Sequence, residues 1–170
     1  MSDILTSDTH DIKAGEVVSK PVSASRVEMT QLVTPTDTNY LGNLAGGRLM
    51  HWMDLAAAIA AGRHANAVCV TASVDTLEFK EAIKLGEVVI LKATVNRAFT
   101  TSMEVGVKVF SENLVTGEKK VCNKAYFTFV AVDAALNPVK VPAVTSENDE
   151  DRKRYEKAAL RRQIRLLNKG

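Results

Sequence analysis

The sequence predicts a single α+β domain in which one long helix is wrapped by a twisted antiparallel β-sheet. Two patterns carry this prediction: an alanine-rich helical stretch at residues 48–65, and four β-rich runs that follow it. The length agrees, because 170 residues suit one domain that buries about 70% of its unfolded surface. The helix is apolar on most faces, so we expect the sheet to cover it.

Composition narrows the class of protein. Hydrophobic residues make up 46% of the chain and charged residues 25%, as in ordinary globular proteins. The 22 basic and 20 acidic residues give a formal charge of +2, which predicts neither a nucleic-acid nor a membrane partner. Two cysteines cannot form a disulfide framework, and no stretch reaches the ~18 apolar residues of a membrane span. With no signal-peptide pattern at the N-terminus, we expect a cytoplasmic protein.

The chain divides into three parts. Residues 1–22 are polar, lack periodicity and end near Pro21, so we expect a flexible tail outside the core. Residues 23–145 form the predicted domain, beginning with a strand at 26–33 and a turn-rich loop before the helix. Gly62 and His64 mark the expected end of that helix.

The β-rich runs at 68–79, 87–99, 102–113 and 120–133 predict an antiparallel meander, because short loops and a tight turn at 100–101 separate them. Their alternation is imperfect, which predicts strands covered on both faces, with the helix on one side.

Residues 146–170 predict a charged C-terminal helix. Ser146 is the expected cap, acids follow it, and bases crowd the far end. Its few apolar residues predict an outer, amphipathic helix. Arg161, Arg162, Arg165 and Lys169 could meet nucleotide phosphates, although a solvated basic face is the simpler interpretation.

Gly46 and Gly47 open the buried helix. Unpaired N–H groups of a first helical turn, with the helix dipole, bind anions or polarised carbonyl oxygens, and glycine lets such a group approach. The alternative is that the pair only permits a tight turn or close packing, and the pattern alone favours this.

Asp54 is the one acid in the middle of the alanine-rich helix. Burial would raise the pKa of its carboxyl group and suit it to general-base catalysis. The alternative is a structural carboxylate paired with His51 or Arg48.

Asp54 follows Gly47 by seven residues, which places it roughly 10 Å further along the helix axis. One helix cannot easily supply both groups to one reacting carbon, so another loop, or the helix of a symmetry-related subunit, must complete a site. Asp37, Asn39 and Asn43 in the preceding loop could cap the helix, form turns or face a ligand.

The stretch TPTDTNYLGNLAGGRLMHWMDLAAAIAA resembles the helix-entry motif of hotdog-fold acyl-CoA thioesterases, in particular the bacterial and cytosolic acyl-CoA hydrolase branch. Further matches are FKEAIKLGEVV, FTTSMEV and AYFTFVAVD, so the resemblance runs from about residue 26 to 142. It implies the hotdog fold, a long helix wrapped by an antiparallel sheet, and hydrolysis of fatty acyl-CoA to free acid and CoA.

The resemblance also implies roles for residues. Asp54 becomes the base or water-orienting carboxylate, Asn39 of the partner subunit positions water or thioester, and Gly46 and Gly47 stabilise the oxyanion. It implies no metal and no cofactor, since CoA is part of the substrate. The nominated CoA-binding positions are Arg97, Thr101 and Ser102, which otherwise read as a plain hairpin turn.

Relatives of this kind assemble as homodimers and often as trimers of dimers, so we expect a homo-oligomer, with a hexamer as its larger form. Two alternatives remain at this stage. One is a non-catalytic hotdog module that binds acyl-CoA or a nucleotide, for which Asn39 and Asp54 would be unnecessary. The other is a hotdog hydratase or dehydratase, whose expected Asp/His or Glu/His pair Asn39 fits poorly.

Overall fold

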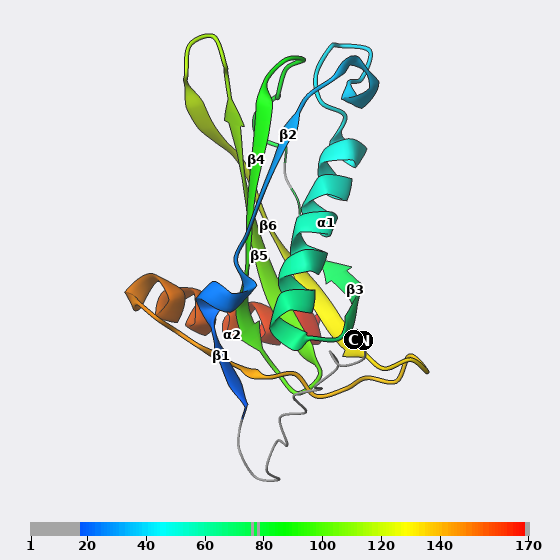
Figure 1. Ribbon diagram of the computed structural model, residues 1–170, viewed down its shortest axis with the longest axis vertical. Helices are drawn as coiled ribbons and strands as arrows, with labels where there is room; N and C mark the ends of the chain where they lie inside the picture. The colour runs from blue at the N-terminus through cyan, green and yellow to red at the C-terminus, as the bar shows by residue number, and fades with distance from the viewer. Residues whose placement is uncertain (1–17, 76, 78, 169–170) are drawn as a thin grey trace, which may run out of the picture.

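The computed structural model describes residues 18–75, 77 and 79–168 and has the predicted α+β hotdog architecture. The central helix α1 (Gly46–Ala65) lies on one face of a curled antiparallel sheet, and the C-terminal helix α2 (Asp149–Leu167) crosses behind that sheet (Figure 1). The long helix begins at Gly46 and ends at Ala65, one residue beyond the predicted end at His64, and Asn66 caps it in the left-handed conformation typical of a helix C-terminus.

Five strands form the main sheet in the order β2-β4-β5-β6-β3. Their bounds are β2 Val27–Leu32, β3 Val68–Val74, β4 Val88–Ala98, β5 Ser102–Glu112 and β6 Lys119–Val132. All neighbouring pairs are antiparallel, as predicted. The predicted meander holds for β4, β5 and β6 but not for β3, which lies beside β6 and not beside β4 because the chain crosses over to the other side of the sheet between β3 and β4. Among the described residues the strand β3 pairs with β6 alone, so no described strand lies along its other edge.

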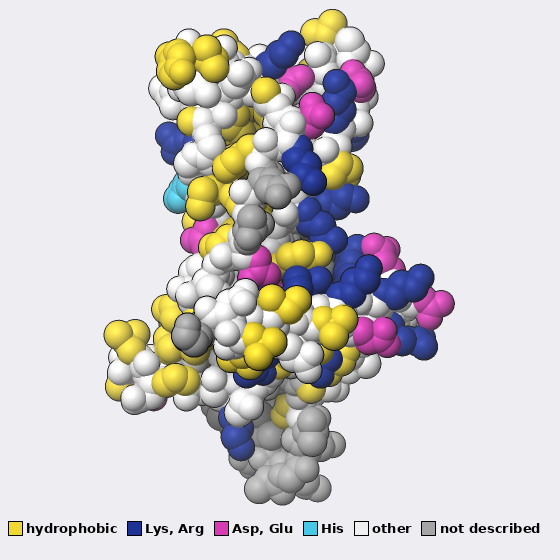
Figure 2. Space-filling view, turned by 180° about the vertical axis from the view of Figure 1, so that it is seen from behind, with side chains coloured by type: hydrophobic (Ala, Val, Ile, Leu, Met, Phe, Trp, Pro, Cys, Tyr) yellow, Lys and Arg dark blue, Asp and Glu magenta, His cyan; other side chains and the backbone are white. Residues whose placement is uncertain are grey.

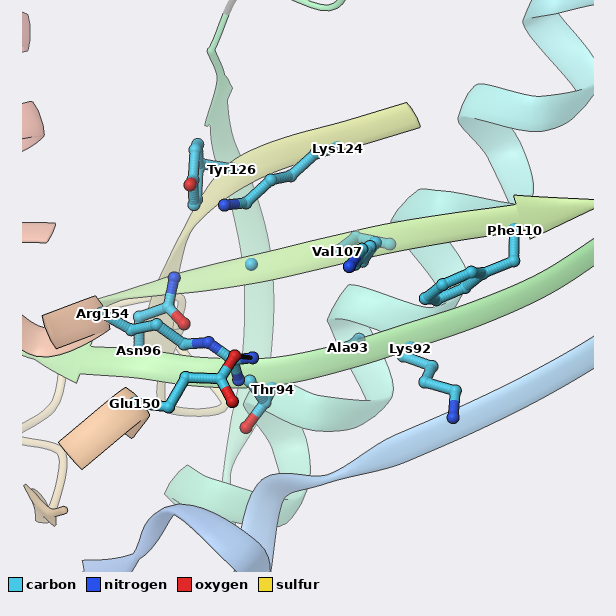
Figure 3. A pocket seen from close by; sticks show the side chains of 12 residues that line it. Lys92, Ala93, Thr94, Asn96, Val107, Phe110, Lys124, Tyr126, Glu150 and Arg154 are labelled. Atoms are coloured by element: carbon cyan, nitrogen blue, oxygen red, sulfur yellow. Dashed lines mark hydrogen bonds and ion pairs between the residues drawn. The ribbon is translucent and has the colours of Figure 1, made fainter. Parts of the chain in front are cut away.

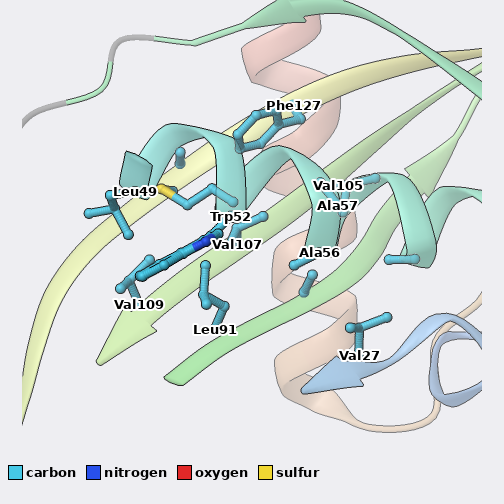
Figure 4. Packing of buried hydrophobic residues seen from close by; sticks show 14 of the residues in the cluster. Val27, Leu49, Trp52, Ala56, Ala57, Leu91, Val105, Val107, Val109 and Phe127 are labelled. Atoms are coloured by element: carbon cyan, nitrogen blue, oxygen red, sulfur yellow. The ribbon is translucent and has the colours of Figure 1, made fainter. Parts of the chain in front are cut away.

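The core lies between α1 and the sheet. Four alanines of α1 are fully buried, which lets the helix backbone approach the strands closely: Ala56, Ala57, Ala60 and Ala61. Nearer the start of the helix, Leu49 and Trp52 pack with Leu91, Val109 and Phe127 of the sheet (Figure 4). The alanine-rich pattern therefore marks the contact face of the helix.

The N-terminal boundary of the fold lies earlier than predicted. Residues 19–22 were expected in a tail, yet Ser19–Pro21 form strand β1 and Val22 is buried at the start of a short 3₁₀ helix, η1 (Val22–Ser25). The partner of β1 is β7 (Ala143–Thr145), a parallel strand that the sequence pattern did not indicate. Residues 1–17 of the expected tail lie outside the described residues.

The first β-rich run after the helix is shorter than predicted. The expected strand covered residues 68–79, but β3 ends at Val74. Residues 75, 77 and 79 are not in a strand, and residues 76 and 78 lie outside the described part of the chain.

Helix α2 differs from the prediction in two respects: the residue that caps its start and the side chains that pack it against the sheet. Its N-cap is Asn148, whose side chain accepts a hydrogen bond from the Asp151 N–H, and not Ser146. Its apolar residues do not form a buried face: Ala158 is buried, whereas Leu160, Ile164, Leu166 and Leu167 are exposed. The helix is therefore held to the sheet by other side chains.

Arginines attach α2 to the sheet. The carboxylate of Glu104 on β5 is fully buried and accepts hydrogen bonds from Arg161 at 2.6 Å and from Arg165 at 3.2 Å. The Arg161 guanidinium also stacks on the Tyr126 ring, 3.6 Å from its centroid, and Arg165 pairs with Asp75. These arginines are thus partly buried ion-pair partners, which contradicts the solvated basic face expected from the sequence.

His64 makes folding stability dependent on pH. Its ring is fully buried, Nε2 donates to the Pro142 carbonyl at 2.8 Å, and Nδ1 has no partner in the described structure. Burial lowers the pKa of His64, with nearby Lys20 lowering it further against the opposing effect of the Pro142 carbonyl. The unfolded chain therefore binds a proton more readily than the folded protein.

We expect the free energy of unfolding to be highest above the unfolded histidine pKa of about 6.5 and to fall as the pH drops below it. Urea unfolding at pH 7.5 and pH 5.5 measures this difference. His64→Gln should flatten it, whereas His51→Gln, on the exposed face of α1, should retain it. Equal pH dependence in wild type and His64→Gln would contradict the assignment.

Neither helix of the described residues is long and apolar enough to cross a membrane.

Candidate active site

The N-terminus of α1 presents free backbone donors. The first helical hydrogen bond runs from the Leu49 N–H to the Ala45 carbonyl, and Ala45 provides no side-chain cap. The N–H groups of Gly46, Gly47 and Arg48 therefore precede the bonded part of the helix. Gly47 has open space where a side chain would stand, so an oxygen atom can reach this backbone.

Asp37 fixes the loop that leads into the helix. Its carboxylate accepts hydrogen bonds from the Thr34 hydroxyl and N–H, its carbonyl accepts from the Ala45 N–H, and Arg48 pairs with it at 3.1 Å. The hydrogen bonds from Thr34, with Arg48, lower the pKa of Asp37 against the opposing effect of burial. Asp37 is thus a structural residue of the loop.

Asn39 is held by its own loop. Its Oδ1 accepts from the N–H groups of Leu41 and Asn43, at 2.9 and 3.2 Å, which is the turn chemistry that its position allows. Both contacts use the oxygen, so the Nδ2 group is the remaining donor of this exposed side chain. The loop therefore presents Asn39 with its amide N–H₂ group available.

A cavity of about 300 Å³ lies at this end of the molecule. Asn39, Asn43 and Gly46 contribute polar groups, while Leu44, Leu49, Phe79 and Ile83 contribute apolar surface. The Phe79 ring lies against Gly46, where an added Cβ would approach it to 3.3 Å. The structure thus brings predicted residues Asn39 and Gly46 to one cavity.

Asp54 lies elsewhere on the helix and has a different partner from those expected. Thr71 on β3 donates its hydroxyl to Asp54 Oδ1 at 2.7 Å. Arg48 pairs instead with Asp37, so the predicted pairing of Asp54 with Arg48 or His51 is wrong for the described residues. Asp54 is also only half-buried in the single chain, in contrast to the burial expected from its apolar neighbours.

Thr71 is a candidate functional residue that the sequence pattern did not reveal. It is exposed on the open edge strand β3, where the register with β6 shifts between Thr71 and Ser73. Such a bulge redirects side chains and is common beside active sites. Here it accompanies a hydroxyl that faces the helix carboxylate and orients it.

The two groups of candidate residues are separated within one chain. Asp54 follows Gly46 by eight residues, which is about 12 Å along the helix. Along the exposed face of α1 that contains Asp54 the surface is apolar and open: Met50, Leu55 and Ile59 are each 42% to 43% exposed. A single chain therefore leaves Asp54 beside an uncovered apolar surface.

The positions nominated for CoA do not gather with Asn39 or Asp54. Arg97 lies under α2, where its guanidinium stacks on Tyr155 at 4.0 Å and on Phe99 at 5.6 Å. The Thr101 carbonyl accepts the Ala131 N–H within the hairpin end. Ser102 lines a separate cavity of about 180 Å³ with Arg162 and Arg165.

The chain is similar to known thioesterases. The family model of the thioesterase superfamily matches residues 41–118. The acyl-CoA thioester hydrolase YkhA of Bacillus subtilis, described as uncharacterised, is 42% identical over 127 residues, covering 75% of this chain and 74% of that protein. Mouse acyl-coenzyme A thioesterase 11 is 44% identical over 143 residues, 84% of this chain, but the chain spans only 24% of its length.

Solved structures agree with this similarity. An apo-hexameric acyl-CoA thioesterase superposes with a TM-score of 0.88 at 40% identity, covering 91% of this chain and 99% of that one. An acyl-CoA hydrolase from Staphylococcus aureus, solved with butyryl-CoA and CoA, superposes with a TM-score of 0.81 at 35% identity, covering 89% and 94%.

The S. aureus hydrolase was also solved as three alanine variants, of an asparagine, an aspartate and a threonine. These three residues have the same sequence spacing as Asn39, Asp54 and Thr71.

Proposed function

The chain belongs to the thioesterase superfamily, and from this premise we propose that it hydrolyses acyl-CoA thioesters to a free acid and CoA. The observation that carries the proposal is the hydrogen bond from Thr71 to Asp54 Oδ1 beside an open apolar surface. It leaves Oδ2 of an oriented carboxylate to accept a proton from water. The spacing shared with the three substituted residues of the S. aureus hydrolase supports this assignment.

The chemistry follows from these groups. Asp54 accepts a proton from a water molecule, whose oxygen attacks the thioester carbonyl carbon and forms a C–O bond. The carbonyl oxygen becomes negative and is stabilised by the free N–H groups at Gly46 and Gly47, helped by the Asn39 Nδ2 group. The C–S bond then breaks, and the CoA sulfur receives the proton that Asp54 holds. No step requires a metal.

Two subunits build each site in this proposal. The open edge of β3 and the apolar surface beside it favour pairing with a second copy of the chain about a two-fold axis. Such pairing buries Asp54 and brings it toward the Asn39 and Gly46 end of the partner. The hexameric assembly of the similar thioesterase favours trimers of such dimers.

A non-catalytic acyl-CoA binder would use the same cavity but would gain nothing from an oriented carboxylate. A hydratase or dehydratase would need a second acid or base beside Asp54, and the contact that Asp54 makes is with a neutral hydroxyl. Hydrolysis therefore explains more of the observed contacts than either alternative.

Replacing Thr71 with Val tests the orienting hydrogen bond. Hydrogen bonds to charged groups contribute about 1.5 to 3 kcal/mol, so we expect kcat to fall roughly 10-fold to 100-fold. Thr71→Ser keeps the hydroxyl and should retain most activity. The measurement is the rate of CoA release under saturating acyl-CoA. A wild-type kcat in Thr71→Val would remove this hydrogen bond from the mechanism.

A further inference from the structure

Three lysines stand side by side on the face of the sheet opposite α1. Lys92 of β4 is directly paired with Lys108 of β5, which is directly paired with Lys124 of β6. All three are exposed, and neighbouring strands are about 4.8 Å apart. Like charges directly opposite one another destabilise a sheet. Figure 2 shows the dark blue side chains of this face continuing from the sheet onto α2.

Within the described residues, a carboxylate neutralises the positive charge at only one end of this lysine row. Lys92 pairs with Glu28 of β2 at 3.0 Å. Within residues 18–75, 77 and 79–168, neither Lys108 nor Lys124 forms an ion pair. Their ammonium groups lie over the Phe110 and Tyr126 rings, at 5.0 and 5.2 Å from the ring centroids. The row therefore retains positive charge that no described carboxylate neutralises.

The lysine row lines a cavity of about 380 Å³, within the range of small-molecule sites. Figure 3 shows Lys92, Lys124, Phe110 and Tyr126 around it, with Glu150 and Arg154 of α2 also at the cavity. Among the described residues that line this cavity, Glu150 supplies the single carboxylate, and it is paired with Arg154. The cavity thus has a net positive lining.

The cavity also contains a buried acceptor without a partner. Asn96 is 3% exposed, and its Nδ2 donates to Glu104 Oε1 at 3.0 Å, which identifies the other amide atom as Oδ1. That Oδ1 has no hydrogen-bond partner in the described structure. Gly106 lies beside it, and a Cβ there would stand 2.8 Å from Asn96 Nδ2. This oxygen is closed to solvent, so Asn96 gives the cavity a polar floor and not an exposed contact atom.

The geometry points to a second ligand site, separate from the proposed catalytic residues, that binds a small molecule carrying a diphosphate or triphosphate. The phosphates contact Lys108 and Lys124, because adjacent ammonium groups match a multivalent anion better than a single carboxylate. This inference goes beyond hydrolysis, since the lysine row and Asp54 lie on opposite sides of the sheet.

Calorimetric titration of the full chain with inorganic tripolyphosphate at low ionic strength tests the charged part of the site. We expect saturable binding that weakens at least 10-fold in the double variant Lys108→Met, Lys124→Met. Lys120→Met is the matched control, because Lys120 is an exposed lysine of the same strand outside the cavity. Its affinity should equal that of wild type. Removing the repulsion should leave the melting temperature of the double variant equal or higher, which separates lost binding from lost folding.

Titrations with ATP and with CoA then distinguish a nucleoside polyphosphate from the diphosphate of CoA, by which of them shows lysine-dependent affinity. No binding of tripolyphosphate, or equal loss in the double variant and Lys120→Met, would overturn the site. If the double variant bound both ATP and CoA as tightly as wild type, neither compound would be a ligand of the lysine site, which would contradict an organic phosphate as the ligand. Because these are binding measurements, they remain decisive even if no thioester is hydrolysed.

Discussion

Asp54→Asn is expected to lower kcat for acyl-CoA hydrolysis by at least ~100-fold while the protein remains folded. Asparagine has nearly the same shape and keeps an oxygen that accepts the Thr71 hydroxyl, so the contact between α1 and β3 survives. What disappears is the ability to take a proton from water. Steady-state release of CoA, measured beside the circular dichroism spectrum, checks both parts of this expectation.

Glu118→Gln is the matched control, because Glu118 is an exposed acid in the turn between β5 and β6. Its kcat should equal that of wild type. Asp54→Asn with wild-type turnover would show that the carboxylate is not the base.

The second large effect is recovery of activity by mixing two inactive variants. Asn39→Ala is expected to lose activity because it removes the free Nδ2 donor, and Asp54→Asn loses the base. If each site takes Asn39 from one subunit and Asp54 from the other, a hybrid dimer contains one intact site and one doubly altered site. After complete exchange at equal concentrations, we expect roughly a quarter of wild-type activity per chain.

A preparation carrying both substitutions in one chain provides the control, because its hybrids with either single variant contain no intact site. Native mass spectrometry verifies that subunits have exchanged. Verified exchange without recovery would place Asn39 and Asp54 in sites built within one chain.

The helix and the meander could be predicted because their signals are local. Alanine spacing in α1 and β-rich runs separated by short turns depend on neighbouring residues, and the structure confirms the helix and the meander of β4, β5 and β6. The place of β3 beside β6 was not predicted, because that pairing joins strands more than fifty residues apart. Strands β1 and β7 have three residues each and pair across more than a hundred positions, so no local pattern distinguishes them from coil. The ion pairs that attach α2 to the sheet could not be predicted either, because Glu104 lies 57 residues before its partner Arg161.

The candidate site could be predicted only in part from the sequence, for the same reason. Gly46 and Asn39 stand close together in sequence and meet at one cavity. Asp54 can pair with Thr71 only if the helix and the following strand lie side by side and antiparallel, joined by the turn at Asn66. Asp54 lies about 18 Å before that turn and Thr71 about 17 Å after it, so the two meet at similar height. The sequence spacing therefore predicts that Asp54 and Thr71 are close, but this prediction can be made only after the strand is known to pack on the helix.

The burial predicted for Asp54 was wrong for the single chain because an isolated sequence does not distinguish a core face from an interface. Met50, Leu55 and Ile59 extend the apolar pattern of α1 around the helix, yet each is more than 40% exposed. We interpret this face as the surface that a second subunit covers. The apolar periodicity therefore predicted that this face of α1 is covered, but it did not show whether the same chain or a second subunit covers it.

Thiol release by the purified protein from a series of acyl-CoAs, from butyryl-CoA to palmitoyl-CoA, tests the central claim most directly. We predict release of CoA in equal amount to free acid with at least one chain length, and its loss in Asp54→Asn under the same conditions. Absence of CoA release from every member of the series, with tight binding of acyl-CoA or CoA, would contradict hydrolysis. The protein would then be a binding module, and the catalytic roles proposed for Asp54, Asn39 and Thr71 would fall.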